Sequence, residues 1–148
     1  MTDLLDHVRA NAVEGDPGSV IAAIDDYDRA RGAMIHVGPD KGAVLDQVVR
    51  DSGALRVLEL GTNYGYSALR MTRNLPPSAI ITTIEIDHRL AAIAEAVITF
   101  AGMADRITQI RGEARRVIPQ LAEPLEQVEV VEIRLLEVVD KDQIERLG

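Results

Sequence analysis

The spacing of apolar positions divides the chain into a helical first third and a later region in which strands and helices alternate. Apolar side chains recur at helical spacing in three early segments, which predicts three amphipathic helices over residues 3–12, 18–31 and 43–52. Thr2 and Ser19 are the expected N-terminal caps of the first two helices. The link over residues 32–42 contains three glycines and a proline, which indicates irregular backbone.

From residue 55 the pattern changes to short apolar runs that alternate with helix-length amphipathic segments. This order is typical of a parallel sheet built from βαβ units. The predicted strands cover residues 55–60, 79–86 and 106–110, and the predicted helices cover residues 66–75, 87–102 and 113–122. Asp87 and Gly102 are the expected start and stop signals of the second of these helices, and Pro119 interrupts hydrogen bonding inside the third.

The last part of the chain has a different pattern. β-branched residues are concentrated between residues 128 and 139, which predicts a fourth strand. Asp140 and Gln143 resemble a capping box that opens a short final helix. One continuous amphipathic helix is the alternative, because short apolar runs suit both structures. We expect a single domain over residues 1–148, divided into N-terminal helices, βαβ units and a divergent tail over residues 1–54, 55–121 and 122–148.

Composition narrows the classes of function. The 148 residues, of which 47% are hydrophobic, suffice for one domain with a substantial core. A net charge of −8 argues against nucleic-acid binding, which depends on basic side chains. The absence of cysteine excludes disulfides and thiolate chemistry. No stretch resembles a signal peptide or a membrane-spanning helix, so we expect a soluble cytoplasmic protein without a membrane partner.

The segment VLELGTNYGYS, residues 57–67, contains the first candidate site. An apolar strand carries an acid, Glu59, near its end, and a turn with Gly61 and Gly65 leads into a helix. Ligands of open α/β sheets bind at the carboxyl ends of the strands. Gly61 allows a ligand to approach the backbone, and Gly65 allows the helix to pack near the strand. The spacing matches neither the dinucleotide fingerprint nor a Walker motif, which disfavours a phosphate clamp.

Two acids indicate which kind of cofactor this turn would hold. Glu59 would repel a pyrophosphate, but it suits a ligand with a nearby positive ammonium, such as S-adenosylmethionine. Glu85 ends the second strand 24 residues after Gly61, where an acid can accept both ribose hydroxyls. Each feature alone is also compatible with a purely structural role. In combination and in this order they favour a nucleoside cofactor.

The sequence resembles a known family over most of its length. The segments VLELGTNYGYSALRMTRNL, ITTIEIDHRLAAIAEAVITFAGMADRIT, GEARRVIPQL and AMIHVGPDKG are similar to catechol O-methyltransferase and its bacterial relatives, without a gap from about residue 3 to about residue 121. The resemblance implies an α/β class, namely the N-terminal half of a Rossmann-like class I methyltransferase fold with about four mostly parallel strands. It also implies Mg²⁺-dependent transfer of a methyl group from S-adenosylmethionine to a catechol-like hydroxyl of a small molecule.

The same resemblance implies cofactor contacts by motif position. Val37 would lie against the methionine portion, and Glu59 and Gly61 would contact the amino-acid part. Ser67 would bind the carboxylate, Glu85 would hold the ribose, and Ile86 would pack on the adenine. The complete set of implied cofactor-binding residues is Val37, Glu59, Gly61, Asn63, Ser67, Glu85, Ile86 and Gly112.

The catalytic residues of the family find no match, so the catalytic and metal residues stay unassigned. Without a gap, the metal-binding Asp of the family falls on Leu136 and the basic Lys falls on Val139. A shift of one residue places Glu137 at the metal position and Asp140 where the Lys should be. Methyl transfer by this chain alone is therefore one hypothesis, and a non-catalytic S-adenosylmethionine-binding or self-associating module is the alternative.

The apolar tail also predicts self-association. A four-stranded half of the family sheet would leave the edge of the tail strand unpaired, and such an edge invites pairing with another chain. We therefore expect a homodimer or a higher oligomer in which tail strands pair or exchange between subunits.

Overall fold

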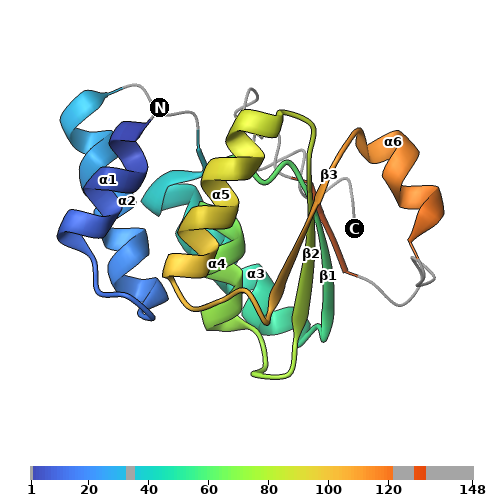
Figure 1. Ribbon diagram of the computed structural model, residues 1–148. Coiled ribbons are helices and arrows are strands. Elements are labelled where there is room, and N and C mark those ends of the chain that lie inside the picture. The colour runs from blue at the N-terminus through green and yellow to red at the C-terminus, as the bar shows by residue number, and fades with distance from the viewer. Residues whose placement is uncertain (1, 33–35, 122–128, 133–148) are drawn as a thin grey trace.

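The computed structural model describes residues 2–32, 36–121 and 129–132, which form a parallel sheet with helices on both faces (Figure 1). The helices are α1 Thr2–Asn11, α2 Pro17–Arg31, α3 Gly38–Ser52, α4 Tyr66–Asn74, α5 His88–Phe100, α6 Ala114–Val117 and the 3₁₀ turn η1 Ile118–Gln120. The strands are β1 Arg56–Leu60, β2 Ile80–Glu85, β3 Ile107–Arg111 and β4 Glu129–Glu132.

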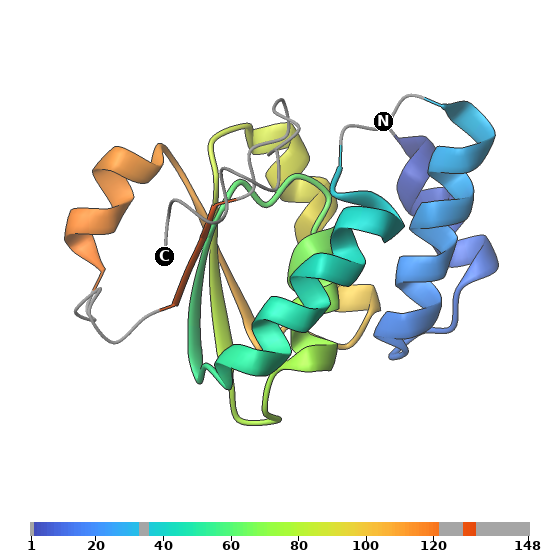
Figure 2. The ribbon, with the colours of Figure 1, turned by 180° about the vertical axis from the view of Figure 1, so that it is seen from behind.

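The strand order is β3-β2-β1-β4, and all three pairings are parallel. Helices α1 to α5 lie on one side of the sheet, while α6 lies on the other (Figure 2). This arrangement confirms the predicted α/β class with a four-stranded, mostly parallel sheet. Because β1 is hydrogen-bonded on both edges, the residues near its end are enclosed by neighbouring strands as well as by helices.

The hydrophobic core lies between the sheet and helices α1, α2, α4 and α5. Strands β1 and β2 contribute Val57 and Ile81 to it, and α4 contributes Leu69 and Met71. Val97 of α5 is fully buried on the same side. None of the helices in the described ranges is both long and apolar enough to cross a membrane.

The start of α2 differs from the expectation. Asp16, not Ser19, caps this helix, and its carboxylate accepts from the backbone amides of Gly18 and Ser19 at 2.9 and 3.2 Å. The Ser19 hydroxyl instead accepts from the Val13 amide at 2.8 Å. The prediction of Ser19 was wrong because Pro17 occupies the first helical turn, where its fixed φ is already helical and its missing N–H costs nothing.

The start of α3 was also placed too late. The helix begins at Gly38, so residues 38–42 of the link predicted as irregular belong to its first turns. Pro39 again stands at the beginning of the helix, where proline is tolerated.

From α5 onward the described structure matches the predictions in part. Asp87 caps α5 as expected, and its carboxylate accepts from the amides of Arg89 and Leu90. Helix α6 ends after four residues and passes into η1, which contains Pro119. Strand β4 falls inside the predicted range 128–139; the rest of that range and the predicted final helix lie outside the described residues.

Candidate functional site

The turn between β1 and α4 has an unusual backbone. Gly61, Asn63 and Gly65 have positive φ values of 93°, 51° and 83°. The Gly61 amide donates to the Ile84 carbonyl of β2 at 2.9 Å, and the Gly65 amide donates to the Thr62 carbonyl at 2.9 Å. These bonds hold the turn against the carboxyl end of β2.

The close approach of a neighbouring helix leaves little room for a side chain at Gly65. A Cβ atom at this position would lie 3.1 Å from Cγ1 of Ile98, a residue of α5. Close packing at Gly65 was predicted, but the partner that approaches it is α5 instead of the preceding strand. The turn is therefore confined between α5 and β2.

A small pocket opens beside this turn, with about 250 Å³ of space including the part that is open to solvent. Four of the residues with implied cofactor contacts meet in its wall, namely Val37, Gly61, Asn63 and Ser67. The remaining wall residues are His36, Thr62, Tyr64 and Tyr66. The segment before α3 and the β1–α4 turn thus come together, although they are far apart in sequence.

Glu59 is fully buried near the end of β1. Its Oε2 accepts a 2.6 Å hydrogen bond from the Thr83 hydroxyl of β2, and its Oε1 accepts one from the Ser67 hydroxyl of α4. Burial raises the pKa of Glu59 to about 7; the two hydroxyls lower it, and the charge of Glu85 adds a smaller rise. Glu59 therefore changes its protonation state near neutral pH.

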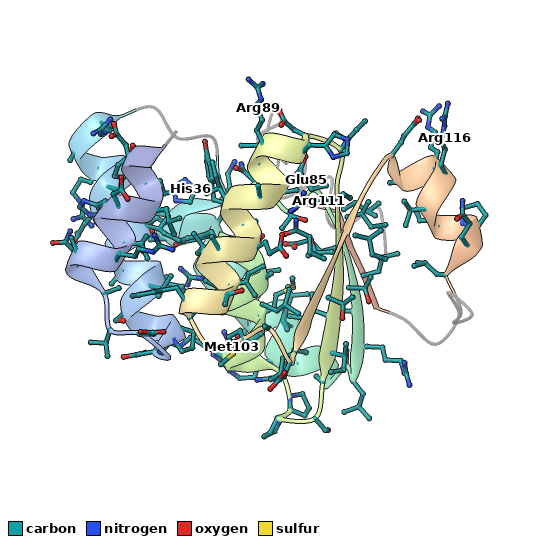
Figure 3. The ribbon with its side chains drawn as sticks, viewed as in Figure 1. His36, Glu85, Arg89, Met103, Arg111 and Arg116 are labelled. Atoms are coloured by element: carbon teal, nitrogen blue, oxygen red, sulfur yellow. The ribbon has the colours of Figure 1, made fainter. Side chains whose placement is uncertain are left out.

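Glu85 occupies the end of β2 and joins two turns. Its Oε2 accepts from the Asn63 amide at 2.8 Å, and its Oε1 accepts from the Asp87 amide at 2.9 Å. Its own carbonyl accepts from the Gly112 amide at 2.8 Å. Figure 3 shows Glu85 at the end of the sheet from which α5 begins. The carboxylate is mostly buried, and backbone amides fix its orientation.

Ile86 and Gly112 lie at the same end of the sheet, because they follow β2 and β3 directly. The Ile86 side chain is 65% exposed, which is unusual for a large aliphatic residue. A Cβ atom at Gly112 would lie 3.0 Å from Cγ2 of Val117 in α6. The exposed Ile86 is thus an apolar surface that directly follows Glu85 in the chain.

His36 is packed into the pocket wall. Its side chain is 4% exposed, and its two ring nitrogens lie 3.8 Å from carboxylate oxygens of Asp25 and Asp28, respectively. Its ring meets Tyr66 edge to face with the centroids 4.6 Å apart. The Tyr66 hydroxyl accepts from Arg70 at 2.9 Å, and burial raises the pKa of Tyr66 to about 12. His36 therefore connects α2 with α4.

The sequence analysis missed two residues of the site, Thr62 and Thr83. Their hydroxyl oxygens lie 2.7 Å apart, and both side chains are buried. Thr83 is directly opposite Glu59 in the β1–β2 register. The threonine pair inside the mostly apolar segment IITTIEI was the available signal, since a buried hydroxyl needs a polar partner.

The described residues contain no group of three or more acidic or histidine side chains that could hold a metal ion. Lys41, the one lysine among the described residues, is exposed. The positions weighed for the metal and the base, from Leu136 to Asp140, lie outside the described residues. The described part of the chain therefore offers no site that fits Mg²⁺.

Comparison with known proteins identifies the family. A sequence model of the O-methyltransferase family matches residues 24–143. The chain belongs to the O-methyltransferase family. Bovine catechol O-methyltransferase is 45% identical over 118 residues, which are 80% of this chain and 43% of the relative. The mouse catechol O-methyltransferase is 43% identical over 118 residues, or 80% of this chain and 44% of the relative.

Solved O-methyltransferase structures agree with this assignment. The Bacillus cereus O-methyltransferase, solved with S-adenosylhomocysteine, is 27% identical with a TM-score of 0.62, over 76% of this chain and 52% of that one. TomG from Streptomyces achromogenes, solved with S-adenosylmethionine, is 30% identical with a TM-score of 0.61, over 70% of this chain and 47% of that one. This member of the family thus spans less than half the length of the curated relatives named above.

Replacement of Gly65 should destabilise the fold more than replacement of another left-handed glycine. Gly32 also has positive φ, but a Cβ atom there would meet nothing within 4 Å. We expect Gly32→Ala to cost about 1 kcal/mol for the backbone conformation alone, and Gly65→Ala about 3 kcal/mol because Ile98 must also move. Urea unfolding of both variants measures the difference. Equal losses in the free energy of unfolding would contradict the close approach of α5.

Removal of the Glu59 charge should stabilise the protein at alkaline pH. Folded Glu59 keeps its proton up to about pH 7, whereas the unfolded chain releases it near 4.5. The folded state therefore loses stability as the pH rises from 4.5 to 7, by a total of about 3 kcal/mol. We expect Glu59→Gln to remove this loss.

Urea unfolding at about pH 5 and about pH 8 tests this expectation. From about pH 5 to about pH 8, the free energy of unfolding of the variant should rise by about 2–3 kcal/mol relative to that of the wild type. Glu14→Gln, which removes an exposed acid, is the control and should follow the wild type. A parallel pH dependence of Glu59→Gln and the wild type would show that Glu59 is ionised throughout.

Proposed function

We propose that this chain binds S-adenosylmethionine at the carboxyl ends of β1 and β2, as the cofactor-binding part of an O-methyltransferase. The observation that carries the proposal is the carboxylate of Glu85, which the amides of Asn63 and Asp87 hold in a fixed orientation beside the exposed Ile86. A fixed carboxylate next to an apolar surface suits a ribose followed by an aromatic base.

The residues fit the nucleoside in three respects. Each oxygen of Glu85 accepts one backbone amide, and a carboxylate oxygen has a further lone pair that can accept a ribose hydroxyl. Ile86 offers its exposed side chain to one face of the adenine. Gly112, whose amide is bonded to the Glu85 carbonyl, brings the chain after β3 to the same place.

The pocket beside the β1–α4 turn suits the amino-acid end of the cofactor. Gly61 is exposed and has no side chain, so a ligand can approach its backbone. Val37 supplies an apolar wall, and Ser67 and Asn63 supply polar groups. Glu59 places a negative charge behind this wall at neutral pH and above, which favours an ammonium group in the pocket.

The proposed reaction is methyl transfer to a hydroxyl of a catechol-like small molecule, as the resemblance implies. When bound, S-adenosylmethionine would supply the methyl group for the hydroxyl oxygen, the hydroxyl proton would pass to solvent, and S-adenosylhomocysteine would be the second product. No step is assigned to Mg²⁺, because no group of the described residues fits it. The second candidate function is cofactor binding without transfer.

Calorimetric titration with S-adenosylmethionine tests the binding. We expect Glu85→Gln to weaken the affinity at least tenfold, since it removes charged acceptors for two hydroxyls. Ile86→Ala should weaken it about fivefold through lost apolar contact. Glu95→Gln, an exposed acid of α5, is the control for charge and should bind like the wild type.

The outcomes separate the two candidates. Binding together with methylation of catechol in the presence of Mg²⁺ would support the transferase, and binding without turnover would support the non-catalytic module. If the wild type gives no heat with S-adenosylmethionine, or if Glu85→Gln binds as tightly as the wild type, the proposed site is wrong.

We also propose that the chain self-associates through its last strands. In the described sheet β4 pairs with β1 and is the outermost strand on that side. Outer strands of a sheet can pair with a strand of a second chain. Sedimentation velocity should show a dimer or larger species at micromolar concentration; a monomer throughout this range would contradict the proposal.

A further inference from the structure

Three hydroxyls and one carboxyl form a continuous hydrogen-bonded chain between the core and the pocket. Thr62 and Thr83 lie 2.7 Å apart, Thr83 donates to Glu59 at 2.6 Å, and Ser67 donates to the other oxygen of Glu59. Thr62 and Ser67 both line the pocket, whereas Glu59 has no exposed surface. The two ends of this hydrogen-bonded chain, Thr62 and Ser67, therefore lie at the pocket wall, and its centre is an ionisable group.

Counting hydrogens gives the direction of each bond. A hydroxyl has one hydrogen to donate and two lone pairs to accept. Thr83 uses its hydrogen on Glu59, so Thr62 must be the donor in the bond between the two threonines. Ser67 also uses its hydrogen on Glu59. With Glu59 ionised, all three hydrogens point inward, and Thr62 and Ser67 offer only acceptors to the pocket.

Protonation of Glu59 reverses the direction of the hydrogen bonds on one side of this carboxyl. The carboxylic acid then has a hydrogen of its own, which it donates to Ser67 or to Thr83. In the first case the hydrogen of Ser67 becomes available to the pocket. In the second case Thr83 donates to Thr62, and the hydrogen of Thr62 becomes available. Either way, one proton taken up in the core exposes one hydrogen-bond donor at the pocket wall.

We propose that the protonation state of Glu59 sets the hydrogen-bonding polarity of the pocket wall, and that binding of a ligand's amino-acid end is thereby linked to one proton. This inference rests on the proposed cofactor site and adds the regulation of that site. The ionised form presents acceptors and a buried negative charge, which attract an ammonium; Ser67 then has no hydrogen left for the carboxylate contact that the resemblance implies. Glu59 is a positioning residue in this scheme, since it acts through the hydroxyls of Thr62 and Ser67.

Other ionisable groups near the pocket do not replace Glu59 in this role. Glu85 of β2 raises the pKa of Glu59 by its charge, but it is bound to two backbone amides. Tyr66 of α4 keeps its proton at neutral pH, since its pKa is raised to about 12. His36, with Asp25 and Asp28 behind it, is the other ionisable group of the pocket wall and is controlled for by its own variant.

Two related ligands isolate the amino-acid end. S-adenosylhomocysteine carries this end, and 5′-methylthioadenosine contains the same nucleoside without it. Calorimetry of the full chain from about pH 5.5 to about pH 8.5 should show the affinity for S-adenosylhomocysteine falling up to tenfold per pH unit below about 7. The affinity for 5′-methylthioadenosine should stay constant. Buffers of different ionisation enthalpy should show release of about one proton on S-adenosylhomocysteine binding near pH 6.

Variants assign the linked proton. Glu59→Gln should abolish the pH dependence, and His36→Gln should keep it. Thr83→Val removes a hydrogen bond that lowers the pKa of Glu59, so the midpoint should move to higher pH while the slope remains. Glu14→Gln serves as the control for an exposed acid. A slope that persists in Glu59→Gln, or a constant affinity for S-adenosylhomocysteine in the wild type, would overturn the proposal.

Infrared spectroscopy of the ligand-free protein keeps the test independent of the cofactor. A carbonyl stretch of a protonated carboxyl should be present at about pH 6, lost at about pH 8.5, and absent in Glu59→Gln at both. If no nucleoside binds but this band titrates, the proposed cofactor is wrong and the proton switch at the pocket stands. If the band is missing at about pH 6, the switch itself is wrong.

Discussion

The fully buried carboxyl of Glu59 is the constraint on which the site depends. It stands near the end of the central strand β1, where two neighbouring strands and a helix exclude water from it. A carboxyl in such a position must find hydrogen-bond partners inside the protein. Thr83 of β2 and Ser67 of α4 provide them, so the same interaction that satisfies Glu59 joins the strand pair to the first turn of the helix.

The turn above Glu59 is shaped by its neighbours. The left-handed backbone of Asn63 directs its amide to Glu85, and Gly65 leaves room for Ile98 of α5. As a result, the ends of β1 and β2 present two acids of different character. Glu59 is enclosed by hydroxyls and changes protonation near neutral pH, whereas Glu85 is held by backbone amides. Because both residues are glutamates, the difference between them comes from their environments.

Membership of the O-methyltransferase family agrees with this arrangement of the sheet and turn. The matched region covers less than half of the length of the catechol O-methyltransferases compared above, and the described part of this chain holds no group suited to a metal. Cofactor binding and methyl transfer are the two functions proposed for this chain. The described residues bear on the first of them, because they include all eight positions with implied cofactor contacts.

The sequence alone determined the fold class, the strand–turn–helix unit at residues 57–67 and the cap of α5, because these features follow from local periodicity and turn chemistry. It misplaced the starts of α2 and α3, where a proline and a glycine in the first turn were taken for loop residues. Only the tertiary structure decided the partners of Glu59. Thr83 and Ser67 lie 24 and 8 residues away in sequence, and they reach the carboxyl through strand register and helix docking. Since burial and those hydroxyls set the pKa of Glu59, the chemistry of the site depends on contacts that local sequence does not encode.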